Sequence, residues 1–137
     1  MKQLRDIKDN ENYIFLAITE TWLTDQIMDT EINLDGFIIH RQDRLERKHG
    51  GVALYVNETT VSKVVHGKST KNCESLIVEL SDLKVIIGVI YRPPNCPVHH
   101  FNDHLTDMGE LIRYYDNKCE GWVSLIMGDI DFPFIKN

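Results

Sequence analysis

Five side chains that are able to do phosphate chemistry follow apolar runs of strand length. In chain order they are Glu20 after residues 14–18, Tyr91 and Arg92 after residues 85–90, and Asp129 and Asp131 after residues 123–127. Carboxylates that follow buried strands emerge at one rim of a sheet, where water and substrate reach them. A rim with three carboxylates, a tyrosine and an arginine predicts metal-assisted phosphate chemistry.

The individual residues suggest separate roles. A hard cation takes one or two carboxylates and fills its other positions with water and phosphate oxygens, so Glu20 is the predicted ligand for Mg²⁺ or Mn²⁺. Asp129 and Asp131 project to the same side of extended backbone and would crowd one site. The Tyr91 hydroxyl and the Arg92 guanidinium are suited to phosphate. The structural alternatives are a solvated or capping glutamate, a Gly-Asp turn and a strand-end aromatic before a Pro-Pro turn.

Composition indicates a globular domain and excludes a protein that binds nucleic acid through an overall positive charge. The 137 residues are 42% hydrophobic and 26% charged, and the formal net charge is −6, so nucleic-acid binding would need a local basic patch. The apolar runs are too short to span a bilayer, and residues 1–12 are too polar for a signal peptide. We expect an intracellular protein, nuclear or cytoplasmic, not secreted and not in a membrane. Cys73, Cys96 and Cys119 favour buried or free thiols over disulfides.

Short apolar runs separated by turn residues predict strands joined by hairpins. The predicted strands are residues 14–18, 37–40, 52–56, 61–65, 76–80, 85–90 and 122–127, after a candidate helix over residues 1–10. Residues 57–60 predict a hairpin turn, as do residues 81–83. Apolar residues from Phe101 to Tyr115 recur at helical spacing, so residues 98–117 predict an amphipathic helix. This order, ending in a buried strand, favours a mixed-sheet α/β (α+β) sandwich over a doubly wound parallel sheet.

Five strings of residues occur in a recognisable order. They are T-E-T-W-L at residues 19–23, R-x-D-R at 41–44 with G-G-V-A-L-Y-V at 50–56, G-V-I-Y-R-P-P at 88–94 and M-G-D-x-D-F-P at 127–133. Together they resemble the endonuclease/exonuclease/phosphatase superfamily, and within it the apurinic-type endonuclease domain of LINE-type retrotransposons, the elements without long terminal repeats. The resemblance implies a two-sheet β-sandwich flanked by helices, in four layers, and a Mg²⁺-dependent endonuclease that acts on DNA.

The resemblance also implies residue roles and exposes departures. Glu20 matches the metal-ligand glutamate, Tyr91 the tyrosine near the scissile phosphate, and Asp129 the aspartate that orients or deprotonates the attacking water. Asp131 stands where the family has an asparagine that donates to the phosphate, which a carboxylate cannot do unless it is protonated. The sequence has no Ser-Asp-His string and no first strand with an active-site asparagine. We expect one partial domain over residues 1–137, incomplete at both ends and weakly active or inactive.

Two further groups of residues suggest binding. Arg41, Arg44, Arg47 and Lys48 form a basic loop that, with Arg92, is predicted to contact the DNA backbone; a solvated charged loop is the alternative.

The histidines suggest a second possibility. His100 and His104, with His99 and Cys96 nearby, have a spacing that binds zinc on a helix, although surface histidines on the polar face are expected.

Three functions therefore stay open at this point. They are a Mg²⁺-dependent phosphodiesterase, a non-catalytic remnant that binds nucleic acid or protein, and a zinc-binding module. A phosphomonoesterase of the same superfamily is also compatible with the fold, because fold does not fix function. Missing terminal strands would leave sheet edges unpaired, so self-association through those edges is a further expectation.

Overall fold

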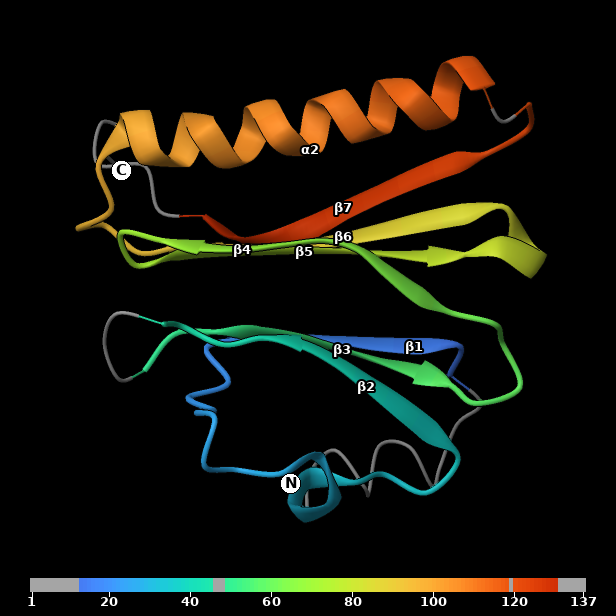
Figure 1. Ribbon diagram of the computed structural model, residues 1–137, viewed down its shortest axis with the longest axis horizontal. Coiled ribbons are helices and arrows are strands. Elements are labelled where there is room, and N and C mark those ends of the chain that lie inside the picture. Colours follow the sequence, from blue (N-terminus) through green and yellow to red (C-terminus); the bar gives the residue numbers. More distant parts are fainter. Residues whose placement is uncertain (1–12, 46–48, 119, 131–137) are drawn as a thin grey trace.

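The structure, a computed structural model, describes residues 13–45, 49–118 and 120–130, and arranges them in two β-sheets and one long helix (Figure 1). The candidate helix over residues 1–10 lies outside the described residues. The elements are β1 (Phe15–Thr19), the 3₁₀ turn η1 (Asp29–Ile32), β2 (Phe37–Gln42), β3 (Val52–Asn57), β4 (Lys63–Thr70), β5 (Cys73–Leu80), the 3₁₀ turn η2 (Ser81–Leu83), β6 (Val85–Arg92), α2 (Val98–Lys118) and β7 (Val123–Ile130).

The two sheets lie face to face, and α2 covers the outer face of the larger sheet (Figure 1). The smaller sheet has the order β1-β3-β2, with both pairs antiparallel. The larger sheet has the order β4-β5-β6-β7, in which the last pair is parallel and the others are antiparallel. The predicted two-sheet sandwich with a mixed sheet is confirmed.

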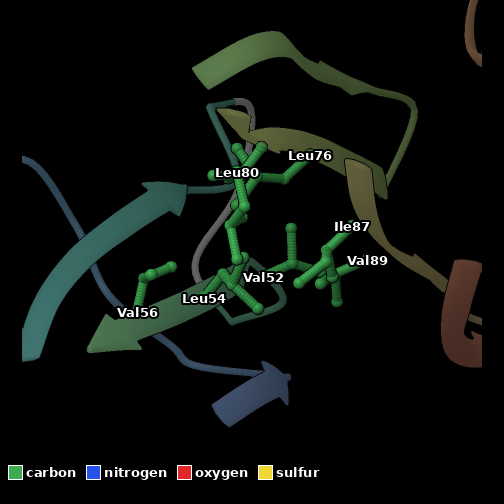
Figure 2. Close-up of a cluster of buried hydrophobic side chains, with 8 residues drawn as sticks. Val52, Leu54, Val56, Leu76, Leu80, Ile87 and Val89 are labelled. Atoms are coloured by element: carbon green, nitrogen blue, oxygen red, sulfur yellow. The ribbon is translucent and has the colours of Figure 1, made fainter. Parts of the chain in front are cut away.

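The space between the sheets is filled by alternating apolar side chains, as two packed sheets require. Alternate residues of β3, β5 and β6 point into this core, and Figure 2 shows how the side chains from the two sheets meet. The buried members are Val52, Leu54, Val56, Leu76, Val78, Leu80, Ile87 and Val89. Fully burying one such side chain contributes about 1.5–3 kcal/mol, so this layer holds the two sheets in a fixed relation.

The residues that alternate with these core residues along β5 and β6 lie on the opposite face of the larger sheet. This face packs against α2. Ile77, Ile86 and Ile90 from the sheet meet Phe101 and Met108 from the helix. Gly88 lies under the helix, and a Cβ there would come within 2.6 Å of Ile126 Cδ1 and 3.1 Å of Met108 Cε. The glycine therefore permits close approach of α2, and the helix connects β6 to its parallel neighbour β7 across the sheet.

Two sequence-based expectations about the strands are wrong. Residues 57–60 do not form a hairpin, because β3 is the central strand of its sheet, paired with β1 and β2, and has no edge left for β4. β4 instead starts the other sheet. The last strand was expected to be buried, but β7 lies at the sheet edge and its Leu125 and Ile126 are 42% and 43% exposed. Self-association through such an edge stays a prediction.

The structure also bears on two predictions about the cysteine thiols and about membrane-spanning segments. Cys73 and Cys96 are buried and free, as predicted, and Cys119 lies outside the described residues. Burial raises the pKa of both thiols. Over the described ranges, no helix combines the length and apolar composition needed to cross a membrane.

His104 was expected on the polar face of the helix, but it is fully buried between α2 and the larger sheet. Its Nδ1 lies 2.6 Å from Ser75 Oγ, and its Nε2 lies 2.8 Å from Thr70 Oγ1. Ser75 Oγ also lies 2.7 Å from His66 Nε2. Hydroxyls from β4 and β5 thus satisfy both ring nitrogens of His104, which is why an imidazole is tolerated in this interface.

The buried imidazole predicts that acid destabilises the fold. Burial lowers the pKa of His104 to about 4, and the positive charges of Lys68 and His66 act in the same direction. Because the unfolded chain takes up this proton near pH 6.5, it binds more protons than the folded chain between about pH 6.5 and 4. The contribution of His104 to the free energy of unfolding should be fully retained above pH 6.5 and should fall by about 3 kcal/mol on acidification to pH 4.

Urea unfolding at a series of pH values measures this effect. His104→Gln should remove much of the fall, whereas the control His99→Gln, at an exposed position of the same helix, should keep it. Equal pH profiles for the two variants would contradict the assignment.

Candidate active site

Glu20 and Tyr91 meet at one rim of the sandwich. Glu20 is the first residue after β1, and Tyr91 is the second-last residue of β6, in the other sheet. The Tyr91 hydroxyl donates a hydrogen bond of 3.0 Å to Glu20 Oε1 across 71 positions of sequence. The structure therefore brings together two of the predicted site residues from separate sheets.

Asp129 lies beside this pair. It is opposite Tyr91 in the parallel register of β6 and β7. Tyr91 and Met127 both pack against the core between the sheets, and Asp129 follows Met127 by two residues, so its side chain leaves β7 on that same face. Its negative charge contributes to the raised pKa of Tyr91. Asp131 lies outside the described residues.

The Tyr91 hydroxyl is a proton donor at neutral pH. Burial raises its pKa to about 12, and the hydrogen bond to Glu20 and the charges of Glu20 and Asp129 add to this, against an opposing effect of Arg44. Glu20 and Asp129 are both exposed, so the rim is open to solvent. A neutral phenol between two solvated carboxylates is able to donate to a phosphate oxygen while a cation offsets the negative charge.

The segment that carries Glu20 is held by the glycine pair at residues 50–51. Thr21 N donates to Gly51 O at 3.3 Å, and Trp22 N donates to Gly50 O at 2.8 Å. Glu20 and Trp22 have positive φ of 53° and 59°, conformations that L-residues adopt at a cost. Left-handed non-glycine residues of this kind concentrate at functional sites, where surrounding contacts maintain them.

The described residues fit a Mg²⁺ ion. Glu20 and Asp129 supply two exposed carboxylates, and Mg²⁺ takes one or two carboxylates together with water and phosphate oxygens. Within the described ranges, no group of three or more His, Cys, Asp or Glu side chains is arranged as a metal site. The third predicted carboxylate, Asp131, is not among those ranges.

The predicted DNA-contacting arginines lie in different environments. Arg92 is 1% exposed, and its Nη2 donates to Cys96 O at 2.7 Å, so its expected position at the surface is wrong. It alternates with Tyr91 along β6 and therefore points to the helix side of the sheet, over the Phe101 ring.

Arg41 and Arg44 are engaged within the chain. Arg41 forms ion pairs with Asp29 and Asp43 at 2.9 and 2.7 Å, and it donates to the carbonyl oxygens of Ile27 and Thr24. These contacts tie the 24–29 loop to β2. Arg44 pairs with Glu74. Arg47 and Lys48 lie outside the described residues, so a DNA contact by the basic loop stays a prediction.

Sequence reasoning missed two contributors to the rim. Glu74, a charged residue in the second position of β5, is fully buried and forms an ion pair with Arg44. In the sequence, the one indication of this role was that an acidic residue precedes the apolar run 76–80. Trp22 is 55% exposed, and its ring centroid lies 3.8 Å from that of His49. Trp22 belongs to the T-E-T-W-L string, and His49 directly precedes the glycine pair. Because the two lie far apart in the sequence, only the folded chain shows that their rings stack.

Comparisons with known proteins bear on the fold. No protein-family model matches the chain, and no curated protein matches it. The catalytic domain of human Nocturnin with bound sulfate superposes with a TM-score of 0.57 and 12% identity, over 94% of this chain and 56% of that one. The Bacteroides thetaiotaomicron mannosyl-6-phosphatase Bt3783 gives 0.61 and 11%, over 93% and 54%. A humanised D. rerio TDP2 gives 0.53 and 9%, over 93% and 53%.

At these identities the likeness shows the fold alone. The chain spans slightly more than half the length of the solved structures that it matches. The chain therefore has the fold of these three solved structures.

The glycine pair gives a stability prediction with an internal control. Gly51 has φ of +87°, and a Cβ there would lie 2.5 Å from Thr21 Oγ1. Gly121 has a similar φ of +82°, but a Cβ there would meet nothing within 4 Å. Gly121→Ala should therefore cost only the backbone strain, about 1–2 kcal/mol, and Gly51→Ala should cost at least 1 kcal/mol more through overpacking. Chemical denaturation measures both; equal losses would show that the rim contact is not tight.

Proposed function

We propose that this chain is a Mg²⁺-dependent phosphodiester hydrolase domain of the retrotransposon DNA-endonuclease type. The observation that carries the proposal is the Tyr91–Glu20 hydrogen bond beside Asp129 on an open rim. The fold and the order of the sequence strings support the same assignment. A hydrogen bond that only stabilised the fold would not need two exposed carboxylates beside a partly buried phenol. It would also not need the strained backbone at Glu20 and Trp22.

Each residue has a distinct role in this proposal. Glu20 holds the cation, which when bound supplies Lewis-acid stabilisation of a phosphate oxygen. The Tyr91 hydroxyl, protonated at neutral pH, donates to the phosphate and at rest keeps the Glu20 carboxylate in place. Asp129 orients water or accepts its proton. DNA is the proposed substrate, and Arg47 and Lys48 are the proposed backbone contacts, because Arg41 and Arg44 are already paired with carboxylates.

The proposed activity is weak. Asp131 brings a negative charge to the position where the resemblance expects an amide donor. Loss of one donor to a developing charge costs roughly 10²–10³ in rate.

Metal binding tests the role of Glu20. Calorimetry with Mn²⁺ should show weak binding to the chain, and Glu20→Gln should reduce the affinity at least about tenfold because the amide loses the charge that attracts the ion. The matched control is Glu58→Gln, an exposed glutamate just after β3. Unchanged binding in Glu20→Gln would remove this residue from the site.

Plasmid nicking tests the chemistry. With Mg²⁺ and supercoiled plasmid, we expect little activity from the chain and an increase of roughly 10²-fold in Asp131→Asn, which restores a donor. The gain should vanish when Glu20→Ala and Asp129→Ala are added. Robust nicking by the unmodified chain that the Glu20→Ala/Asp129→Ala variant lacks would contradict the assignment of weak activity. Equal rates in all variants would contradict the proposed site.

A further inference from the structure

The most deeply buried charge near the rim is the carboxylate of Glu74. Its side chain is fully buried, and that of its partner Arg44 is 9% exposed. Arg44 Nε and Nη2 lie 3.1 and 3.3 Å from the two carboxylate oxygens, and Gly51 N donates to Oε1 at 2.6 Å. A buried carboxylate needs several donors to offset its desolvation, and these contacts supply three.

The first set of contacts leads from Glu74 to the Glu20 segment. By accepting from Gly51 N, Glu74 fixes the glycine pair, whose carbonyl oxygens accept from Thr21 N and Trp22 N. The Thr21 hydroxyl also donates to Gly50 O. Because these bonds flank Glu20 directly, the direction in which its carboxylate leaves the backbone depends on the glycine pair.

The second set leads from Glu74 to Tyr91. The two residues are opposite each other in the antiparallel register of β5 and β6. Glu74 orients the Arg44 guanidinium, whose Cζ lies 5.9 Å from the centroid of the Tyr91 ring and whose Nη2 also donates to Asn72 O. A guanidinium over an aromatic face is attracted by the ring and restricts its rotamers.

The two sets are joined at Gly50. A Cβ on Gly50 would lie 2.4 Å from Arg44 Cζ, so the guanidinium rests directly on the glycine pair. One buried carboxylate thus constrains both partners of the Glu20–Tyr91 hydrogen bond, one through backbone and one through Arg44.

We propose that Glu74 is a positioning residue that, through Gly51 and Arg44, fixes the geometry in which Glu20 and Tyr91 bind the cation and phosphate. This inference rests on the proposed function. Residues behind metal ligands typically change metal affinity by about 10–100-fold when they are replaced. An ion pair that only stabilised the fold would change the stability and leave the affinity of the folded protein unaltered.

Two readouts separate positioning from stability. The first is amide hydrogen exchange at Thr21 and Trp22, relative to exchange at Leu54 in the centre of β3, and it needs no metal. The second is the affinity for Mn²⁺. Glu74→Gln is compared with Glu79→Gln on the same strand. Glu79 accepts a hydrogen bond from the Tyr115 hydroxyl on the helix side of the sheet, and its replacement removes one negative charge there.

A second variant guards against unfolding. Removing one partner of a buried ion pair leaves the other charge uncompensated, whereas replacing both by apolar residues is often neutral for stability. Arg44→Met/Glu74→Met should therefore fold even where Glu74→Gln does not, and it lacks the same positioning contacts.

The expected result is faster exchange at Thr21 and Trp22, by at least about tenfold relative to Leu54, and Mn²⁺ affinity lowered by about 10–100-fold. Glu79→Gln should change neither the relative exchange at Thr21 and Trp22 nor the Mn²⁺ affinity. A folded variant with unaltered relative exchange, or with wild-type Mn²⁺ affinity, overturns the proposal. If the unmodified chain binds no Mn²⁺, the proposed function fails, and relative exchange alone then decides whether Glu74 orders the Glu20 segment.

Discussion

The parallel pairing of β6 with β7 is the constraint on which the candidate site depends. A parallel neighbour needs a crossover, and α2 supplies it along the outer face of the larger sheet (Figure 1). Both strands therefore end at the same rim, which places Asp129 beside Tyr91. β1 lies against β6 and β7 from the smaller sheet and ends there too, so Glu20 arrives from the opposite layer. Packing between the sheets thus sets the spacing of the reactive groups.

Negative charge predominates at this rim. Glu20 and Asp129 are exposed and negative in a chain of net charge −6, which favours a cation and disfavours DNA. The Arg44 guanidinium lies over the Tyr91 ring, and the carboxylate of Glu74 neutralises its charge. The rim is therefore acidic until a cation binds, and phosphate recognition depends on that cation more than on arginine side chains.

The local periodicity of the sequence predicted much of the fold. Two short apolar runs separated by a turn predicted the pair β5 and β6, and helical spacing predicted α2 to within one residue at its C-terminal end. Periodicity does not specify which sheet a strand joins, so β3 and β4 were wrongly paired. Arg92 and His104 were assigned to the surface on residue type, but partners from distant segments make their burial favourable.

The candidate site was predictable to a similar degree. Glu20, Tyr91 and Asp129 were named from residue type and strand ends, and the structure places these three together. The contacts of Glu74 with Arg44 and Gly51 connect residues 23 to 30 positions apart, and no short string encodes them. Their detection required the folded chain, because a buried charge is recognised by its partners and not by its neighbours in sequence.

The most direct test of the central claim is paramagnetic broadening by Mn²⁺ in amide spectra of the ¹⁵N-labelled chain. The account predicts that substoichiometric Mn²⁺ first broadens the amides of Glu20, Thr21, Tyr91 and Asp129, which belong to three separated parts of the sequence. Loss of this pattern in Glu20→Gln would assign the ion to the rim. Broadening centred instead on the acidic segment from Asp25 to Asp35, or spread evenly over the surface, would contradict a cation site between Glu20 and Asp129.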